Sequence, residues 1–519
     1  FSRPQNSTDC TVWEVHISDF SSDIHSGVSA PNMGKYLAFT ESDTTLDGKG
    51  KFPTCLNYLK KLGITHVQLL PMFDYASVDE GGSSKQFNWG YDPLNYNAPE
   101  GSYSTNPANG AVRINECKQM IQALHSAGIG VIMDVVYNHT YDTQRSWLHQ
   151  TVPYYFHRTD ENGNFANGSA CGNETASERF MCRRFIIDSV LYWAKEYHLD
   201  GFRFDLMGLH DVDTMNLLRK GLDKLPNGDK ILLYGEPWYA SAPKLKSSYP
   251  ADKANLHRLS PRIGAFCDNT RDCIKGDVFK RRKGAFVNGV KGFSNAVKSS
   301  LGGWVGDRFA PALNSSPLQT VSYVSCHDNL TLWDKLVAST KSGRDYSSRD
   351  EDIVAMNKLC AALYILAQGM PFMQAGEEFA RTKLGVENSY RSLKRYNNIH
   401  WARAEQFSDL TDYYKGLLEI RKQFPMLRDT TSQSANTMMF SDTCDSCVAF
   451  TLKGKDNKSF AFCCNAGNKD EIITLKNISP QGTWDVLADG KIAGVLPLYT
   501  LSGDTFAIPA KSCLILSEK

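Results

Sequence analysis

Residues 201–208, Gly-Phe-Arg-Phe-Asp-Leu-Met-Gly, have the pattern of a buried strand that carries two charged side chains. The apolar residues from Phe202 to Leu206 alternate with Arg203 and Asp205. Because successive side chains of a strand point to opposite faces, the two charged groups share one face. A guanidinium so placed keeps the carboxylate of Asp205 ionised at neutral pH, as a nucleophile requires. The alternative, a structural ion pair at the end of a strand, is about equally favoured by these eight residues alone.

The same unit, a helix followed by a buried strand, recurs along the first 428 residues. Helices that alternate with strands predict a parallel α/β fold, and eight strands predict a closed (β/α)8 TIM barrel rather than a doubly wound sheet. In such barrels the loops at the C-terminal ends of the strands carry the chemistry. The predicted strands are residues 11–17, 66–70, 130–136, 201–205, 231–234, 264–267, 320–325 and 371–375.

Two segments depart from this pattern. Residues from about 140 to 181 are polar and rich in Gly and Asn, and we interpret them as a lobe inserted after the third strand, walling one side of a cleft. After residue 428, short alternating runs replace the helix–strand units and predict an antiparallel β-sandwich. The predicted domains are therefore a catalytic barrel at 1–428 and a C-terminal β-sandwich at 429–519. The alternating runs are residues 446–452, 459–464, 471–475, 505–508 and 513–516.

Composition argues against several classes of partner. With 57 Lys and Arg against 56 Asp and Glu, the 519 residues lack the basic excess typical of proteins that bind nucleic acids or anionic membranes. No apolar run reaches the roughly 18 residues of a membrane span, and the chain start does not resemble a signal peptide. We expect the chain to begin after processing or to be a fragment. Its 11% aromatic content suits a flat, uncharged ligand, although core packing alone accounts for it.

Fourteen cysteines leave the redox compartment open. The spacings of Cys267 and Cys273, of Cys444 and Cys447, and of the adjacent Cys463 and Cys464 are compatible with disulfides. Cys444 and Cys447 form a Cys-x-x-Cys, which resembles half of a metal site but has no second half. We expect a monomer that is secreted or lies at the cell surface, with the cytoplasm as the alternative location.

Charged and polar residues gather where four of the predicted strands end. Three carboxylates, each at the end of its own strand and accompanied by two His and an Arg, form a group that chance packing rarely produces. We therefore predict an active site built from Asp205, Glu236 and Asp328, with Asp134 as a supporting residue. The four strand ends are Asp134-Val-Val-Tyr-Asn-His139, Arg203-Phe-Asp205, Gly235-Glu-Pro-Trp238 and Ser325-Cys-His-Asp-Asn329.

Four stretches at these strand ends resemble, in order and spacing, the four sequence regions of the α-amylase superfamily, family 13 of the glycoside hydrolases. They are DVVYNH (134–139), GFRFDLMG (201–208), GEPW (235–238) and SCHDN (325–329). The resemblance covers about residues 10–425, and the tail resembles the C-terminal β-sandwich of that family. A fifth stretch, FNWGYDP (87–93), resembles the YNWGYDP signature of type I pullulanases, with Phe in place of the first Tyr.

The resemblance implies hydrolysis of α-1,6 branch linkages in pullulan, amylopectin and related α-glucans, with retention of configuration. Asp205 is then the nucleophile, and Glu236 is the acid that protonates the leaving oxygen and later deprotonates water. Retention requires the two carboxyl groups roughly 5–5.5 Å apart. It also requires that burial and nearby carboxylates raise the pKa of Glu236. Asp328 is expected to hold the hydroxyl groups of the distorted sugar.

Further residues are expected to contact the glucan. By the same resemblance, His139 and His327 donate hydrogen bonds that strengthen in the transition state, and Tyr91 supplies a flat face for the reacting sugar. The long loop at 79–103, with paired Gly and Ser at 81–84, is expected to place Tyr91 and to block the straight path of an amylose chain. The predicted substrate-binding residues are Trp89, Tyr91, Asp92, His139, Arg203, Trp238, His327, Asn388 and Tyr390.

No cofactor is predicted to be required. Many members of the family hold a structural Ca²⁺ with an Asn at the position of Asn138 and with ligands from the lobe after the third strand. Here the lobe supplies Asp142, Asp160 and Glu161, without the spacing of an EF-hand. A structural Ca²⁺ at this place is therefore left open.

Two other functions are left open as well. One is an enzyme of different specificity on the same barrel: an α-1,4-acting amylase or neopullulanase, an isoamylase or a branching transferase. The FNWGYDP stretch favours a pullulanase over these. The other is a non-catalytic glucan-binding protein, which is expected to have lost one of the three carboxylates. This chain keeps Asp205, Glu236 and Asp328.

Overall fold

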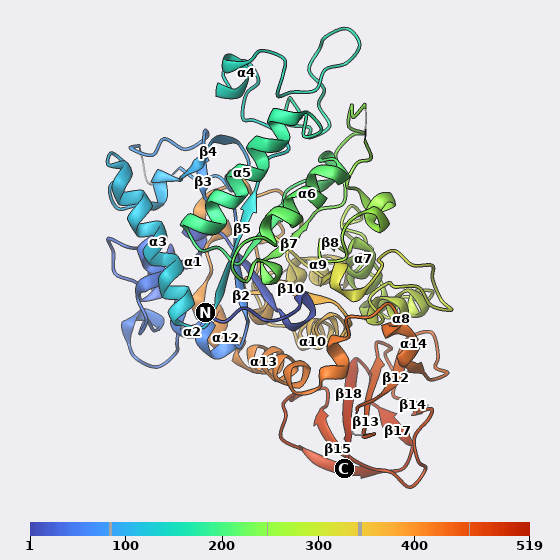
Figure 1. Cartoon of the computed structure of the whole chain (residues 1–519). Helices are drawn as coiled ribbons and strands as arrows, with labels where there is room; N and C mark the ends of the chain where they lie inside the picture. The colour runs from blue at the N-terminus through green and yellow to red at the C-terminus, as the bar shows by residue number, and fades with distance from the viewer. Residues whose placement is uncertain (83–85, 247, 341–344, 456) are drawn as a thin grey trace.

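The computed structural model describes residues 1–519 except 83–85, 247, 341–344 and 456. Eight parallel strands close into a barrel in the order β1-β10-β9-β8-β7-β6-β5-β2 (Figure 1). Each strand overlaps one of the eight predicted strands, so the predicted TIM barrel is confirmed. The strands are β1 (Val12–Val15), β2 (His66–Leu69), β5 (Gly130–Val135), β6 (Gly201–Phe204), β7 (Leu232–Gly235), β8 (Gly264–Phe266), β9 (Thr320–Tyr323) and β10 (Met370–Gln374).

Helices cover the outside of the barrel. In α5, the buried residues Ile186, Val190 and Trp193 recur at intervals of three and four, so they form one apolar stripe toward the strands. In contrast, α10 is buried almost all round, because the barrel covers one side and the C-terminal domain the other. The main helices are α2 (Cys55–Leu62), α3 (Gly110–Ser126), α5 (Phe180–Glu196), α6 (Val212–Leu222), α7 (Asp268–Lys275), α8 (Ser294–Leu301), α9 (Leu332–Thr340), α10 (Glu351–Ile365) and α13 (Ser408–Gln423).

The side chains of β6 show how the barrel positions charged groups. Phe202 and Phe204 point outward into the main core between strands and helices. Arg203, between them, therefore points into the barrel. There it lies above an apolar layer that includes Ile132, Phe266 and Phe372. This layer closes the barrel below Arg203 and so holds its charged group at the C-terminal end.

Two insertions rise from that end of the barrel. The first lies between β2 and α3 and contains an antiparallel pair, β3 (Phe73–Tyr75) and β4 (Pro93–Pro99), which sequence analysis did not predict. The second is the expected lobe between β5 and α5, which contains the short helix α4 (Trp147–Thr151) and projects away from the barrel (Figure 1). Arg158, which pairs with Glu174 and Glu178, ties the lobe together.

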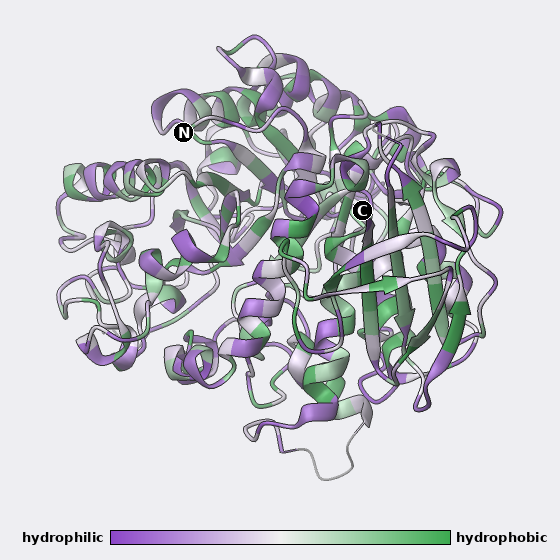
Figure 2. Ribbon diagram, turned by 90° about the horizontal axis from the view of Figure 1, so that it is seen from below, coloured by the Kyte–Doolittle hydropathy of each residue, from purple (hydrophilic) through white to green (hydrophobic). Residues whose placement is uncertain are grey.

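The C-terminal domain is an antiparallel β-sandwich, as predicted. A six-stranded sheet, in the order β11-β12-β13-β18-β15-β16, is accompanied by the pair β14-β17. Trp484, Phe506 and Leu516 belong to the core between them. Figure 2 shows the hydrophobic strands of this domain beside the barrel helices. The strands are β11 (Met439–Phe440), β12 (Cys447–Lys453), β13 (Ser459–Asn465), β14 (Glu471–Thr474), β15 (Thr483–Ala488), β16 (Tyr499–Ser502), β17 (Thr505–Ile508) and β18 (Ser512–Glu518).

None of the helices in the described residues combines the length and the apolar character that a membrane span needs.

Candidate active site

Arg203 lies at the centre of the site, at the C-terminal end of β6. Its Nη1 lies 2.9 Å from Oδ1 of Asp134 and 3.0 Å from Oδ1 of Asp205. Its Nη2 lies 2.6 Å from Oε1 of Glu236. The three carboxylates come from the ends of β5, β6 and β7, which are neighbours in the barrel. One guanidinium, in a residue that is only 2% exposed, therefore gathers three carboxylates.

The chain turns sharply after β6. The strand ends at Phe204, and Leu206 adopts a left-handed conformation with φ 40° and ψ 52°. The prediction that Leu206 continues the strand, facing the same way as Phe202 and Phe204, is therefore wrong. A left-handed residue other than Gly costs roughly 1–2 kcal/mol. The turn directs the backbone N–H of Leu206 at Oε2 of Glu236, 3.0 Å away.

Gly208 allows this turn to lie against the next strand end. A Cβ atom at position 208 would stand 2.6 Å from the backbone oxygen of Trp238, closer than real Cβ atoms approach. The backbone N–H of Gly208 also donates to the carbonyl of Glu236 over 3.0 Å. Because only a residue without a Cβ fits there, Gly208 keeps Asp205 and Glu236 on adjoining turns.

Glu236 stays protonated at neutral pH. Burial is the largest influence and raises its pKa, Arg203 opposes this, and the charges of Asp205 and Asp328 raise the pKa further, to about 8. The sequence predicted this direction and these causes. A carboxylic acid with such a pKa still carries its proton when a substrate arrives at pH 7, as a general acid must.

Asp205 is fixed by two donors. Besides Arg203, Nδ2 of Asn138 donates to its Oδ2 over 2.7 Å and to its backbone oxygen over 2.9 Å. The side chain of Asp205 remains partly exposed, whereas that of Asp134 is completely buried. A carboxylate held from two sides and open on a third is suited to attack a bound substrate.

Asp134 supports the site through Tyr91. The hydroxyl of Tyr91 donates to Oδ2 of Asp134 over 2.8 Å, and the Tyr91 ring stacks on the imidazole of His327 with centroids 5.1 Å apart. Burial raises the pKa of Asp134; Arg203 opposes this and Asp205 raises it further, to about 7. These contacts fix the Tyr91 ring beside the carboxylates.

Glu14, which sequence analysis missed, holds His327. Its Oε1 lies 2.7 Å from Nδ1 of His327, and its Oε2 accepts the backbone N–H of His327 over 2.7 Å. Burial alone lowers the pKa of His327, but Glu14 and Asp328 raise it to about 9. The imidazole is therefore cationic at neutral pH and both of its nitrogens carry hydrogen. The signal for Glu14 was a single charged residue inside the apolar strand Val12–Val15.

His139 contacts protein atoms with both ring nitrogens. Its Nδ1 lies 2.6 Å from Oδ1 of Asn138, and its Nε2 lies 2.8 Å from the backbone oxygen of Tyr91. Burial lowers the pKa of His139. The ring thus links the loop that carries Tyr91 to the end of β5, and its predicted hydrogen bond to substrate stays a prediction.

A cavity of about 460 Å³ opens beside Glu236 and Asp328. Volumes of this size are typical of small-molecule sites. Asp328, with a side chain 47% exposed, faces this cavity, and so does Trp238. Phe279, on the segment after α7, also lines it and is 87% exposed. Sequence analysis missed Phe279, because nothing in its local pattern distinguishes it from other loop residues.

The remaining predicted binding residues lie on two loops that touch each other. The backbone N–H of Trp89 donates to the carbonyl of Tyr390 over 3.0 Å, and Trp89 is only 4% exposed. Its indole lies edge-to-face with His327 and beneath Nζ of Lys383, 4.9 Å from each. Trp89 therefore packs against the His327 ring and helps to hold it in place. Asn388 on the second loop is exposed.

Asp92 is the last of the predicted substrate-binding residues. Its half-buried carboxylate accepts a hydrogen bond from Oγ of Ser77 over 3.1 Å, and burial raises its pKa to about 6. The Ser residues at 83–84, part of the loop expected to block an amylose chain, lie outside the described residues. The contacts of all these residues with a glucan stay predictions.

The residues around Asn138 do not fit the Ca²⁺ site left open by the sequence. Nδ2 of Asn138 is bound to Asp205, and its Oδ1 faces His139. Asp142 in the lobe accepts the backbone N–H of Arg145 over 2.8 Å. These side chains are engaged with separate neighbours and present no shared set of oxygens to a cation.

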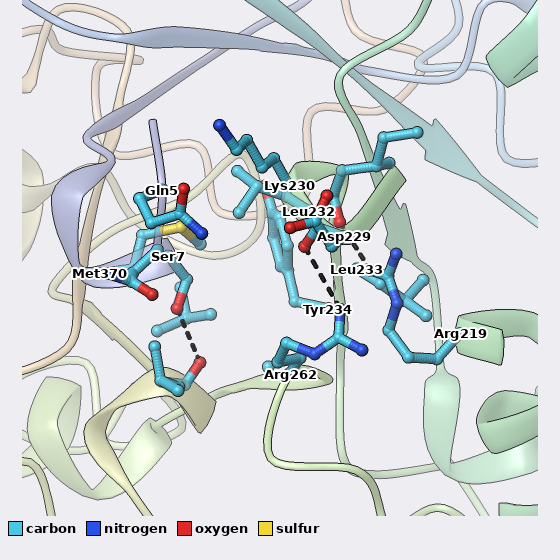
Figure 3. Close-up of a pocket in the computed structure, with 15 residues that line it drawn as sticks. Gln5, Ser7, Arg219, Asp229, Lys230, Leu232, Leu233, Tyr234, Arg262 and Met370 are labelled. Atoms are coloured by element: carbon cyan, nitrogen blue, oxygen red, sulfur yellow. Dashed lines mark hydrogen bonds between the residues drawn. The ribbon is translucent and has the colours of Figure 1, made fainter. Parts of the chain in front are cut away.

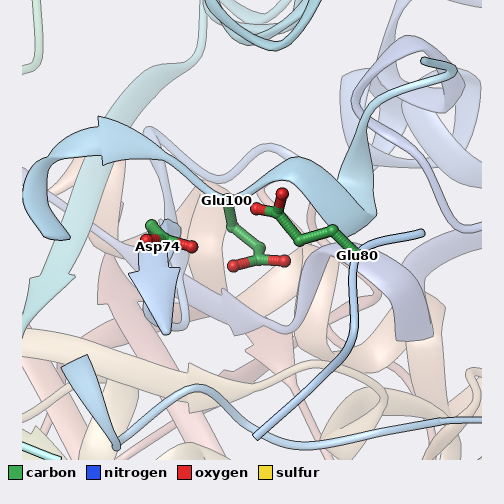
Figure 4. Close-up of side chains that lie close together, drawn as sticks. All are labelled: Asp74, Glu80 and Glu100. Atoms are coloured by element: carbon green, nitrogen blue, oxygen red, sulfur yellow. The ribbon is translucent and has the colours of Figure 1, made fainter. Parts of the chain in front are cut away.

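Three acidic side chains meet elsewhere, at the β3–β4 insertion (Figure 4). Asp74, Glu80 and Glu100 place oxygens within 4.8 Å of one another, the one such group of three potential metal ligands in the described residues. However, Nη1 of Arg113 lies 2.6 Å from Glu80, and the backbone N–H of Ser102 donates to Glu100 over 2.8 Å. We interpret this acidic cluster as structural: its hydrogen bonds stabilise the β3–β4 insertion.

A second cavity lies at the opposite, N-terminal end of the barrel (Figure 3). Its lining includes Ser7, which donates to the carbonyl of Leu318 over 3.0 Å, and Arg219, which donates to the carbonyl of Ile231 over 2.6 Å. A volume of about 50 Å³ holds a few water molecules but not a sugar. This end of a TIM barrel normally serves stability.

Comparison with known proteins places this geometry in a family. The model of the α-amylase catalytic domain matches residues 38–169. A pullulanase of Bacillus subtilis strain 168 is 43% identical over 429 residues, which are 82% of this chain and 57% of the relative. The chain thus spans little more than half the length of that protein.

Solved structures extend the likeness to the whole chain. A pullulanase from Bacillus acidopullulyticus superposes with a TM-score of 0.91 at 40% identity, over 99% of this chain and 61% of that one. A pullulanase from Paenibacillus barengoltzii, in complex with maltohexaose and α-cyclodextrin, superposes with a TM-score of 0.90 at 39% identity, over 100% and 78%. The chain therefore belongs to the α-amylase superfamily of glycoside hydrolases, within the family of the type I pullulanases.

Proposed function

We propose that the chain hydrolyses α-1,6-glucosidic branch linkages of pullulan, amylopectin and related α-glucans, with retention of configuration. The observation that carries this proposal is that the guanidinium of Arg203 binds Asp205 and Glu236 together, at the ends of neighbouring strands. A retaining mechanism needs two carboxyl groups roughly 5–5.5 Å apart on one substrate bond. Because Asp205 and Glu236 bind the same guanidinium, their carboxyl groups lie close together, as this mechanism requires.

The reaction has two steps. In the first, Asp205 attacks the anomeric carbon while Glu236 gives its proton to the departing glycosidic oxygen, so a covalent glycosyl ester forms and the branch leaves as an alcohol. In the second, Glu236, now ionised, removes a proton from water, and the water oxygen displaces Asp205. Two inversions at the same carbon restore the α configuration.

Charged groups around the reacting sugar favour the transition state. The positive imidazole of His327, held by Glu14, is a donor that is already oriented before the substrate binds. Its other nitrogen lies 3.7 Å from Oδ2 of Asp328. We assign both groups to the sugar hydroxyls, since fixed dipoles and charges in a water-poor site stabilise developing charge without reorganisation.

The position of the cavity supports the proposal that the substrate is branched. It extends from Glu236, the acid, toward the aromatic side chains of Trp238 and Phe279, so it lies where the leaving part of the substrate must go. Flat aromatic faces suit sugar rings. The pullulanase from Paenibacillus barengoltzii binds maltohexaose and α-cyclodextrin, which supports an α-glucan as the substrate of this chain. We assign this cavity to the chain that departs on cleavage.

Digestion of pullulan tests the bond specificity. We expect maltotriose as the main product, and negligible cleavage of unbranched amylose, because the proposed enzyme acts on α-1,6 bonds. The measurement is chromatography of the products, with a commercial α-amylase digest as the control. Panose or isopanose as the main product would contradict the pullulanase assignment in favour of an α-1,4-acting enzyme. Release of long chains from glycogen with little action on pullulan would favour an isoamylase.

The pH profile tests the role of Glu236. With a pKa of about 8, the acid is protonated below that pH and loses its proton above it. The value of kcat/KM on pullulan is therefore expected to be nearly constant up to about pH 7, to reach half of this value near pH 8, and to fall about tenfold for each further pH unit. His327, with a pKa of about 9, loses its proton later and steepens the fall.

An activated substrate supplies the control for this profile. An α-maltotriosyl fluoride needs little protonation of its leaving group, so the formation of the glycosyl-enzyme should not follow the ionisation of Glu236. We expect the rate of the first turnover with the fluoride, followed by rapid mixing, to stay level through pH 8. An equal fall on both substrates would move the alkaline limb to another group.

A further inference from the structure

The C-terminal domain contains a pair of cysteines, Cys444 and Cys447, in a tight turn that leads into β12, whose first residue is Cys447. The backbone N–H of Cys447 donates to the carbonyl of Cys444 over 3.0 Å, which closes the four-residue turn 444–447. Such turns bring their first and last Cα atoms to within about 7 Å. Disulfides join Cα atoms roughly 4.4–6.8 Å apart, so a bridge requires at most a small backbone adjustment.

The two thiols differ in access. Cys444 is exposed and Cys447 is buried. Burial raises the pKa of the Cys447 thiol. Both residues line a hollow of about 300 Å³ with Asp442 and Glu471. A small oxidant can therefore reach Cys444 from solvent, and the hollow is shared with Cys447.

A metal site fits this place less well than a disulfide. A structural zinc takes four ligands, and the pair supplies two. Within the described ranges, no His, Asp, Glu or further Cys brings a third ligand atom within 4.8 Å of both thiols. The acidic side chains of Asp442 and Glu471 line the same hollow but lie too far away to complete a site.

We propose that Cys444 and Cys447 form a reversible disulfide that acts as a redox-dependent clasp between the C-terminal domain and the barrel. With oxidised glutathione as the oxidant, the thiolate of Cys444 attacks one glutathione sulfur, and reduced glutathione leaves. The thiol of Cys447 then loses its proton to solvent, attacks Sγ of Cys444 and displaces the second glutathione; because burial raises the pKa of Cys447, this exchange is the slower of the two. Two protein thiols are oxidised to one disulfide, and one glutathione disulfide is reduced to two thiols.

Asp445, one of the two residues between the cysteines, connects the turn to the barrel. The carboxylate of Asp445 accepts the backbone N–H of Gly292 over 2.6 Å and the hydroxyl of Ser294 over 2.9 Å. Ser294 is the first residue of α8, which lies beside β12 (Figure 1). A disulfide across the turn restricts its backbone and so holds Asp445 on the start of α8, whereas the reduced turn moves more freely. This inference does not rest on the proposed hydrolase activity.

Mass spectrometry tests the disulfide. Both cysteines fall in one tryptic peptide, residues 429–453, because no Lys or Arg lies between Arg428 and Lys453. After treatment with oxidised glutathione and alkylation, we expect this peptide to be about 2 Da lighter than its reduced form and to carry no alkyl group. Two alkylated thiols in that peptide after treatment would overturn the proposal.

Three variants separate the roles of the thiols. Cys444→Ser should leave Cys447 reduced, because the buried thiol is not reached by the oxidant. Cys447→Ser should trap the intermediate, with a glutathione adduct of about 305 Da on Cys444. Cys171→Ser, at the other cysteine described as exposed, is the matched control and should form the disulfide as the wild type does. A disulfide that persists in Cys444→Ser would assign it to a different pair.

Amide hydrogen exchange tests the clasp. The N–H of Gly292 should exchange more slowly in the oxidised than in the reduced protein, because its acceptor is held more firmly. Asp445→Ala should still form the disulfide but should remove this difference in exchange. Equal exchange at Gly292 in the two redox forms of the wild type would overturn the clasp while leaving the disulfide to stand on the mass measurement.

Discussion

Asp205→Asn is expected to lower kcat on pullulan by about 10⁴-fold or more while leaving the affinity for malto-oligosaccharides largely intact. The amide keeps the volume of the carboxylate but cannot attack the anomeric carbon. A loss of about 10⁴-fold corresponds to about 5 kcal/mol of transition-state stabilisation. The measurements are steady-state kinetics on pullulan and calorimetric titration of the variant with maltotriose.

Two further variants sharpen this test. Asp188→Asn is the matched control, because Asp188 lies on the surface of α5, 3.3 Å from Arg184, and exposed pairs of this kind contribute little. It should turn over as the wild type does. Asp205→Gly should be partly rescued by azide, with a β-glycosyl azide as the product, since the small anion occupies the space of the missing nucleophile. An Asp205→Asn variant that keeps more than about a tenth of the wild-type turnover contradicts the assignment.

Glu236→Gln is expected to lower kcat on pullulan by at least about 10²- to 10⁴-fold, the usual contribution of a general acid. With α-maltotriosyl fluoride the variant should release about one equivalent of fluoride per enzyme in a rapid burst, because fluoride leaves without a proton. Turnover should then nearly stop, since no base remains to activate water. Mass spectrometry of the stalled protein should find the maltotriosyl group on Asp205.

Glu351→Gln supplies the control for this experiment. Glu351 is exposed on α10, where it pairs with Arg349, and its loss should change neither substrate's kinetics. If Glu236→Gln loses the fluoride burst as well as pullulan hydrolysis, Glu236 serves another purpose and the acid has to be sought elsewhere. A burst with a glycosyl group on a residue other than Asp205 would reassign the nucleophile.

Several helices and strands were not predicted, because their sequences do not show which of their faces is buried. β16 (Tyr499–Ser502) has only four residues and is largely exposed, so its short alternation does not mark a buried face. α7 is short and rich in charged residues, although Arg271 and Lys275 within it are buried. The pair β3 and β4 includes Pro93 and has an irregular register, both of which weaken the pattern of a strand. These elements depend on neighbours that local periodicity does not report.

The candidate active site likewise has parts that the sequence predicts and parts that it does not. Asp205, Glu236 and Asp328 could be predicted from sequence because each follows a buried strand, and a barrel brings all such strand ends to one face. The turn at Leu206 was not foreseen. A non-Gly residue in a left-handed conformation contradicts its local preference, and it is retained because Glu236 accepts the N–H that the turn exposes.

The sequence by itself determines the barrel, the inserted lobe and the β-sandwich, because alternation is a property of neighbouring residues. It also predicts three carboxylates at strand ends, because the order of the motifs is fixed along the chain. The sequence also predicted the direction of the Glu236 pKa shift, but only the tertiary structure shows which neighbours set the charges of the whole group. Arg203 serves three carboxylates at once, and Glu14 makes His327 cationic from 313 residues away. Such contacts depend on burial and on distances of a few ångströms, which arise only when the strands close into a barrel.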